Sequence, residues 1–382
     1  MNGWLETESG TTRGIVDLLQ RLLSEGIVDA LLVPLRTPDG RAVVPTLIRD
    51  PSLLSQARPL APVLPINAGM VLGQITATGP AGRVGAVLRN CELRTVVELS
   101  KVRQALLDDV LLIGVDCLGT YAVEDYADLA AEGIDPVSPA LAMAGQGTVQ
   151  PLEGRAFRAA CTMCERPIPS AGRGAAGGDD YAPHVAIGLL GVPNDQRLWL
   201  SVPDPDLAAV LGIEPADEPV ARDEAIASLI ADRTAERDRR FVRFAEQVSE
   251  PLSLLSEFAT CIRCQNCMVA CPICYCKECI FRTDIFHHPS ARYWDWAARK
   301  GAVRLPSDTL LFHVTRMLHM AHACVGCGMC SDACPVDIPV ADVFRAVGQR
   351  VQQRFDYVPG RHPDEEMVIA TFREDELKDL GG

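Results

Sequence analysis

Features that would direct the chain to a membrane or to nucleic acid are missing from the sequence. No apolar run reaches the length of about 18 residues that a membrane-spanning helix needs. Acidic residues outnumber basic ones, 50 against 36, so the formal net charge is −14. Because a nucleic-acid-binding protein needs a basic face for the phosphates, we do not expect nucleic acid as a partner. Residues 1–12 lack the basic and then apolar pattern of a secretory signal, and we expect a cytoplasmic protein.

Cysteine, in contrast, is abundant, since the 382 residues include 15 cysteines. In a long chain without a secretory signal, clustered cysteines bind metal more often than they form disulfides. An odd number of cysteines also excludes complete pairing. The cysteines therefore predict metal centres in a reducing compartment.

The distribution of apolar runs and turn residues predicts several regions, because single hydrophobic cores rarely grow to this length. Residues 1–75 and 76–250 form the first two regions. The third, at 251–350, holds two cysteine motifs, and 351–382 is an acidic tail.

The first two regions have the pattern of an α/β fold. An amphipathic stretch at 15–23 predicts a helix, which leads into a buried strand at 28–33. Apolar runs at 84–88 and 110–115 flank a helical pattern at 93–106, which predicts a βαβ unit with a parallel sheet. Further elements are predicted as strands at 185–188 and 198–200, a Gly/Ala-rich loop at 170–178 and a long solvated helix at 222–247.

Two copies of one cysteine motif, C-x2-C-x2-C-x3-C-P, lie in the third region. This motif is typical of bacterial ferredoxins with two 4Fe-4S clusters, in which the fourth cysteine of each motif binds the other cluster. A tight loop holds three corners of a cluster, and the fourth ligand comes from elsewhere. One cluster is therefore expected on Cys261, Cys264, Cys267 and Cys334, and the other on Cys324, Cys327, Cys330 and Cys271.

Zinc and disulfides are the alternatives for these cysteines. Zinc favours two separated C-x2-C pairs rather than triplets closed by Cys-Pro, so the clusters are favoured. The segment 272–323 between the motifs contains helical stretches at 293–298 and 309–320. We therefore expect a mostly helical two-cluster ferredoxin domain.

Three more cysteines follow the first motif closely, namely Cys274, Cys276 and Cys279. They could be alternative ligands, a small metal site or packing residues, and we favour roles other than ligands. His313, His319 and His322 are interpreted as packing residues or as part of a cluster's environment.

Four cysteines remain in the first half of the chain. Cys91 and Cys117 each follow a predicted strand, at the carboxyl ends where parallel sheets form their sites. Cys161 and Cys164 form a C-x2-C pair that could complete a set of four. The spacing alone leaves open that these are two buried cysteines and a chance pair.

These cysteine-containing turns resemble those of the beta-subunit family of coenzyme F-420 hydrogenases and formate dehydrogenases. The resemblance is carried by the stretches 89–94, with Asn90 where proline is more usual, 116–120 and 161–164. The opening residues 10–14 and 28–30 also fit the family, so that the similarity covers most of residues 10–200.

The resemblance implies a third 4Fe-4S cluster on Cys91, Cys117, Cys161 and Cys164, and an FAD beside it. The sequence has no strict G-x-G-x-x-G motif for the flavin. The glycine-flanked stretch 10–14 before a helix could seat a phosphate, and Thr11, Thr12 and Arg13 are assigned to the flavin on that basis. An ordinary helix cap explains this stretch equally well.

The expected fold is thus an α/β flavin- and cluster-binding core followed by the helical ferredoxin domain. The expected function is that of an oxidoreductase subunit, which moves electrons through the clusters to or from FAD and on to a deazaflavin. The catalytic formate or hydrogen site is expected on a partner chain. The alternative is an electron-transfer adaptor between a dehydrogenase or hydrogenase and a heterodisulfide-reductase-like partner. The acidic residues Glu92, Asp116 and Glu165 are expected to lower the potential of the third cluster if they are ionised there.

Overall fold

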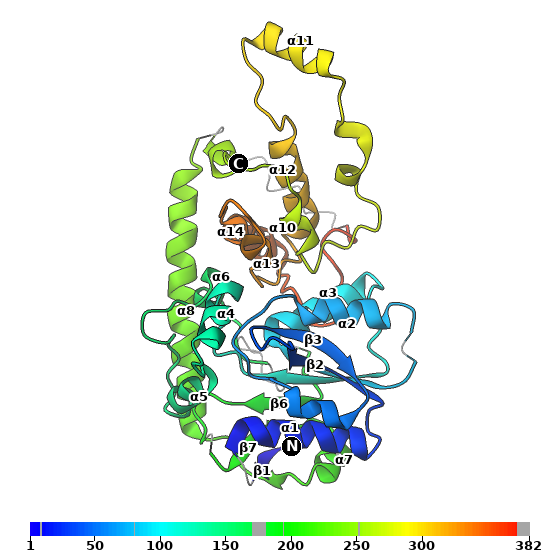
Figure 1. Ribbon diagram of the computed structural model, residues 1–382, viewed down its shortest axis with the longest axis vertical. Helices are drawn as coiled ribbons and strands as arrows, with labels where there is room; N and C mark the ends of the chain where they lie inside the picture. Colours follow the sequence, from blue (N-terminus) through cyan, green and yellow to red (C-terminus); the bar gives the residue numbers. More distant parts are fainter. Residues whose placement is uncertain (8–9, 80, 170–180, 194, 251–252, 373–382) are drawn as a thin grey trace. The chain divides into compact units, whose positions relative to one another are not determined.

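The computed structural model (Figure 1) describes residues 1–7, 10–79, 81–169, 181–193, 195–250 and 253–372. Its contacts divide the chain into two compact units. The first contains Met1–Arg239, Val325–Gly328 and Pro359–Glu365, and the second contains Arg240–Cys324, Met329–Val358 and Glu366–Gly382. The loop predicted at 170–178 lies outside the described residues.

The first unit is built on one mixed sheet of eight strands in the order β3-β2-β4-β5-β6-β7-β1-β8. Neighbours from β2 to β6 in this order are parallel, and the remaining pairs are antiparallel. The strands are β1 (Asn2–Glu6), β2 (Ala30–Arg36), β3 (Val43–Ile48), β4 (Val84–Arg89), β5 (Val110–Val115), β6 (Val185–Gly188), β7 (Arg197–Ser201) and β8 (Glu214–Pro215).

The predicted βαβ unit is confirmed, since β4 and β5 pair in parallel and α3 (Asn90–Lys101) connects them. The other helices of this unit are α1 (Gly10–Ser24), η1 (Pro51–Gln56), α2 (Ala68–Thr76), α4 (Val123–Ala131), α5 (Val137–Gly145), α6 (Ala159–Thr162), α7 (Pro205–Val210) and α8 (Val220–Gln247), of which α8 belongs to it only up to Arg239.

Alternating side chains of the central strands bury both faces of the sheet. Leu111 and Ile113 of β5 pack into one core with α1, whereas Val110 and Leu112 pack into the other with α2 and α3. Successive residues of a strand point to opposite faces, so a continuous apolar run is what a strand covered on both sides requires. Because both faces of the sheet are covered by apolar side chains, polar and metal-binding residues are expected at the ends of the strands.

The long helix α8 confirms the solvated helix predicted at 222–247. Only Arg222, Ala225 and Arg233 of its described residues are buried. No helix in the described part of the chain is both long and apolar enough to cross a membrane.

The second unit is helical, and its described residues form no strand. Its core gathers aromatic and aliphatic side chains, among them Phe258, Phe312 and Phe344. The helices predicted at 293–298 and 309–320 are confirmed as α11 and α12. Its elements are α9 (Ser253–Glu257), α10 (Asn266–Val269), η2 (Ile280–Arg282), η3 (Asp284–Phe286), α11 (Ser290–Lys300), α12 (Thr309–Met320), α13 (Met329–Asp332) and α14 (Val340–Phe355).

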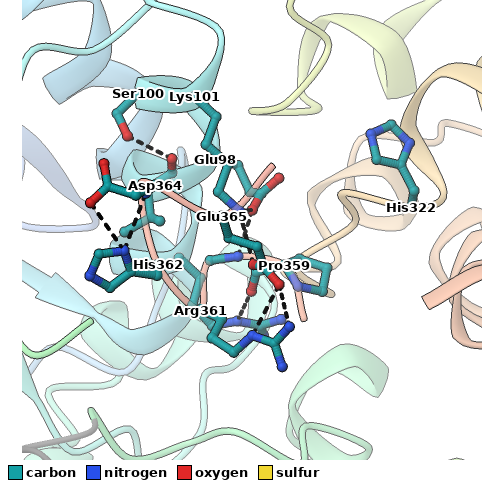
Figure 2. A network of polar contacts seen from close by, with 12 residues as sticks. Glu98, Ser100, Lys101, His322, Pro359, Arg361, His362, Asp364 and Glu365 are labelled. Atoms are coloured by element: carbon teal, nitrogen blue, oxygen red, sulfur yellow. Dashed lines mark hydrogen bonds and ion pairs between the residues drawn. The ribbon is translucent and has the colours of Figure 1, made fainter. Parts of the chain in front are cut away.

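A polar network joins the segment Pro359–Glu365 to α3 within the first unit (Figure 2). The Nζ atom of Lys101 lies 2.9 Å from Glu98 and 3.2 Å from Glu365. The same Glu98 carboxylate accepts the backbone N–H of Gly360 at 2.6 Å. Because Glu98 and Lys101 are buried, the segment is fixed by contacts that water does not screen.

Candidate iron–sulfur centres

The ends of β4 and β5 carry Cys91 and Cys117 to the same edge of the sheet. Cys91 is the second residue of α3, which begins directly after β4, and Cys117 comes two residues after β5. The turn at Cys91 is closed by Glu92, whose carboxylate accepts the backbone N–H groups of Arg89 and Ala68, both at 2.8 Å. The backbone N–H of Cys117 donates to Pro167 O at 3.0 Å. Both cysteines are thus held by short, rigid turns.

The second pair of cysteines meets the first at one cavity. Cys161 lies in α6, and the N–H of Cys164 donates to its carbonyl at 3.3 Å. Cys91, Cys117, Cys161 and Cys164 all line this cavity, and Cys327 of the second ferredoxin motif lines it too. Cysteines from three separate stretches of the sequence are therefore brought to one cavity, and their assignment to a third cluster stays a prediction.

Burial and neighbouring charges raise the pKa of the Cys91 and Cys117 thiols. Burial raises the pKa of Cys91 well above its ordinary value, and Glu92 and neighbouring thiols, Cys117 first, raise it further. Burial, followed by the neighbouring Cys161, raises the pKa of Cys117 to about 11. Such thiols give up their protons when a metal takes their place, because the thiolate is the ligand.

The same cavity is lined by four arginines, Arg89, Arg158, Arg166 and Arg233. Arg158 donates to Thr120 Oγ1 at 3.1 Å and to the Cys327 carbonyl at 2.8 Å. Arg233 donates to the carbonyls of Cys117 and Leu118 at 3.4 and 3.3 Å. A 4Fe-4S cluster bound by four thiolates carries net negative charge, which the arginines that line the cavity would compensate. The residues present therefore fit a 4Fe-4S cluster.

The acidic residues near this cavity are each paired with an arginine. Asp116 contacts Arg222 at 2.6 Å, and both side chains are buried. Glu92 lies 3.7 Å from Arg89, and Glu165 lies 3.9 Å from Arg237. A neighbouring cation offsets the field of each carboxylate, and their expected lowering of a cluster potential stays a prediction.

The residues assigned to the flavin lie at the start of α1. Thr11 is buried, whereas Arg13 is half exposed and pairs with Asp17 at 2.9 Å. Neither they nor Thr12 line the cysteine cavity. Among the described residues, the hydroxyls of Thr7 and Thr11 are buried without a hydrogen-bond partner. The assignment stays a prediction, although two unpartnered hydroxyls suit a polar ligand there.

A second, largely apolar cavity shares Arg89 and Cys117 with the first. Its walls include Leu60, Tyr121 and Phe157. The rings of Tyr121 and Phe157 lie 5.2 Å apart. A flat apolar group bound here would touch the turn that carries Cys117.

The four thiols expected to hold the first ferredoxin cluster lie together in the second unit. Burial raises the pKa of Cys267, Arg316 opposes that rise, and the thiols of Cys261, Cys334 and Cys264 add to it. Such mutual effects weaken with distance, so these four thiols lie near one another. The ligand assignment itself stays a prediction.

The cysteines of the second ferredoxin cluster are divided between the two units. Cys327 belongs to the first unit, while Cys271, Cys324 and Cys330 belong to the second. Their grouping around one cluster stays a prediction.

Cys274, Cys276 and Cys279 line a separate cavity of about 240 Å³, together with Glu278 and His319. Cys276 is exposed, and burial raises the pKa of Cys274. Their interpretation as residues other than cluster ligands also stays a prediction.

In the part of the chain that the structure describes, no three or more His, Cys, Asp or Glu side chains have the arrangement of a metal site. The case for clusters depends instead on shared cavities, mutual pKa effects and nearby cations. Arg158, Arg233 and Arg316 were missed as site residues from the sequence, because an isolated arginine has no local signature.

Comparison with known proteins places the cysteine motifs in a described domain. Residues 257–338, which include all eight ferredoxin-type cysteines, match the 4Fe-4S dicluster domain family. This match covers only the C-terminal part of the chain, and it supports iron–sulfur clusters over zinc.

Two curated relatives match almost the whole chain. One is the F-420-dependent formate dehydrogenase subunit beta of Methanocaldococcus jannaschii, 24% identical over 91% of both chains. The other is the F-420-dependent formate dehydrogenase 1 subunit beta of Methanococcus maripaludis, 26% identical over 92% of both chains.

Among solved structures, the chain resembles one from the F-420-reducing [NiFe] hydrogenase complex of Methanosarcina barkeri. The identity is 14% and the TM-score 0.43, over 63% of this chain and 91% of the other, a likeness too distant to support an argument. The resemblance inferred from the cysteine-containing turns is nevertheless confirmed by the curated relatives: over nine-tenths of its length the chain is similar to beta subunits of F-420-dependent formate dehydrogenases, and its C-terminal region carries a 4Fe-4S dicluster domain.

Proposed function

We propose that the chain is the electron-transfer subunit of a formate dehydrogenase or hydrogenase complex and delivers electrons to a deazaflavin of the coenzyme F-420 type. The observation that carries this proposal is the cavity where Cys91, Cys117, Cys161 and Cys164 meet among four arginines. The names of the two curated relatives support the same activity and imply a separate catalytic subunit that oxidises formate.

Three 4Fe-4S clusters and one FAD are proposed as the cofactors. The clusters would supply single-electron transfer, and the flavin would exchange one or two electrons, which links them to a two-electron carrier. The chain's own residues supply ligands, cations and a dry environment. Cys327, one cysteine of the second ferredoxin motif, lines the same cavity as Cys91.

Two features of the first unit support a flavin. The apolar cavity beside Cys117 offers aromatic and aliphatic walls for a planar ring system. The unpartnered hydroxyls of Thr7 and Thr11 lie at the beginning of α1, where helix N–H groups favour a phosphate. The backbone N–H of Thr7 donates to Gln196 O in the loop after β6, so this helix start lies near the sheet edge where β6 ends.

The test is a direct assay of deazaflavin reduction. The anaerobically purified chain, loaded with clusters and flavin, is reduced chemically and mixed with oxidised deazaflavin. We expect stoichiometric bleaching of the deazaflavin by the native chain and none by Cys161→Ser. A fully loaded native chain that leaves the deazaflavin oxidised contradicts the proposal. That result, with rapid electron transfer to a heterodisulfide-reductase-like protein, would favour the adaptor role instead.

A further inference from the structure

Helix α12 lies between the two ferredoxin motifs in sequence and presents two nitrogen-bearing side chains to the first motif. His313 and Arg316 are three residues apart, so they share a face of the helix. Their exposed fractions are only 1% and 2%. Burying a cation and an imidazole this deeply costs free energy unless each has a polar or charged partner.

Both side chains contact cysteine sulfurs. Arg316 Nη1 donates to Cys267 Sγ at 3.0 Å, and Nη2 donates to the carbonyl of the same residue at 2.9 Å. His313 Nε2 lies 3.4 Å from Cys261 Sγ. A cysteine that ligates iron has no S–H, so each of these contacts must then be an N–H group donating to sulfur.

Packing fixes the two donors in place. The imidazole of His313 stacks on Phe258, with ring centroids 3.8 Å apart and planes 8° from parallel. The guanidinium of Arg316 lies 5.3 Å from the ring of Phe312 and 4.9 Å from that of Phe344. Neither donor can turn away without disrupting this aromatic core.

Arg316 is also a buried cation without an acidic partner. Among the described residues it forms no ion pair with a carboxylate, and its Nε atom has no hydrogen-bond partner. Burying an uncompensated charge is expensive. An anionic cluster held by Cys267 would supply the missing negative charge.

We propose that Arg316 and His313 are positioning residues that raise the reduction potential of the cluster on Cys261, Cys264, Cys267 and Cys334. The inference rests on the proposed function, because it requires a cluster at this motif. Reduction takes up one electron and makes the cluster and its sulfurs more negative. N–H groups and a cation aimed at those sulfurs therefore stabilise the reduced form more than the oxidised form.

The test is a redox titration of the complete chain, followed by electron paramagnetic resonance. The signal of this cluster is assigned first, as the one that Cys264→Ser alters or removes. We expect Arg316→Met to lower the equilibrium constant for its one-electron reduction at least tenfold, which corresponds to about 59 mV downward. Arg316→Lys keeps the charge and should recover much of that loss.

His313→Phe provides an independent variant, since it keeps the stacked ring and loses only the N–H group. We expect a smaller shift in the same direction. The matched control is Arg240→Met, which removes a cation of the same unit that pairs with Asp342 at 3.1 Å. The equilibrium constant for one-electron reduction of the cluster should then stay within twofold of the native value.

Unchanged potentials in both Arg316→Met and His313→Phe, measured on protein with full iron content, overturn the inference and leave the proposed function intact. If Cys264→Ser removes no iron and alters no signal, the motif holds no cluster. That result overturns the proposed two-cluster assignment as well, so the two failures are distinguishable.

Discussion

The two units gather their cysteines in different ways. In the first unit the fold assembles the set, because Cys91 and Cys117 follow separate parallel strands. Cys161 lies in the short helix α6, and Cys164 comes just after it. In the second unit a local motif supplies three of the four thiols. A local motif is visible in the sequence, whereas a set assembled by the fold becomes visible only when the strand order is known.

The surrounding cations differ as well. In the first unit Arg158 and Arg233 donate to backbone carbonyls and a threonine hydroxyl beside the cysteines. In the second unit Arg316 donates to a cysteine sulfur itself. The first arrangement would place positive charge around a bound cluster, while the second would act on one predicted ligand, Cys267. We therefore expect substitutions of the cysteines in the first unit to change the iron content, and substitution of Arg316 in the second unit to change a reduction potential.

The largest effect is expected from removing a ligand in the first unit. Cys161→Ser should lose about four irons per chain, one cluster's worth, and abolish deazaflavin reduction. The matched control is Cys276→Ser in the second unit, an exposed thiol outside both predicted cluster sets, which should keep full iron content. Iron and sulfide analysis of both variants checks this. Equal losses of iron from the two variants would show that Cys161 is no more a cluster ligand than Cys276 is.

A large loss of stability is expected from breaking the buried ion pair beside Cys117. Asp116→Leu removes the buried anionic partner of Arg222 and leaves it only Glu218, which is partly exposed. It also removes the acceptor of the Leu189 and Leu190 N–H groups, so it should cost about 3–5 kcal/mol. Urea unfolding followed by tryptophan fluorescence measures the change.

The control for that variant is Arg239→Met on α8. Its side chain is 69% exposed and pairs with Glu236, so its loss should cost less than about 1 kcal/mol. A cost for Asp116→Leu as small as this would mean that the carboxylate is not fixed by Arg222, and the acidic residue could then act on the cluster.

Gly328 tests how closely the segment Val325–Gly328 packs against α6 within the first unit, because it directly follows Cys327. Its φ is +78°, and an added Cβ would lie 2.3 Å from the Cβ of Ala160. Gly328→Ala should therefore cost about 1–2 kcal/mol of backbone strain and about 1–3 kcal/mol more from the clash. Gly301→Ala is the control, with φ +79° and open space around the added Cβ. Equal urea midpoints for the two variants would contradict the close contact with α6.

The smallest effect expected is a pH dependence in the core of the first unit. Burial lowers the pKa of His184 below 6.5, and its Nδ1 atom accepts the Leu112 N–H at 3.0 Å. The unfolded chain binds the proton more strongly, so stability is complete above about pH 6.5 and falls as the pH drops below that value. The urea midpoint of the native chain should fall more than that of His184→Asn between about pH 7.5 and about pH 5.5. Parallel falls would show that His184 is not the group responsible.

The sequence predicts the central strands of the sheet, but it misses the strands β1, β3 and β8 and the charges around the sites. The runs at 84–88 and 110–115 are apolar throughout because both faces of β4 and β5 are buried, and this pattern is local. The ion pair of Asp116 with Arg222 joins residues 106 positions apart, and no local sequence pattern predicts it. The same holds for Arg316, which from the sequence is one more polar residue on a helix.

The central claim is tested most directly by measuring iron, sulfide and flavin on one anaerobically purified sample of the native chain. The account predicts about twelve irons and about twelve sulfides, four of each for every one of three clusters, with one FAD. About eight irons without flavin would leave only a two-cluster ferredoxin domain. That result would contradict both the cluster in the first unit and the proposed delivery of electrons to a deazaflavin.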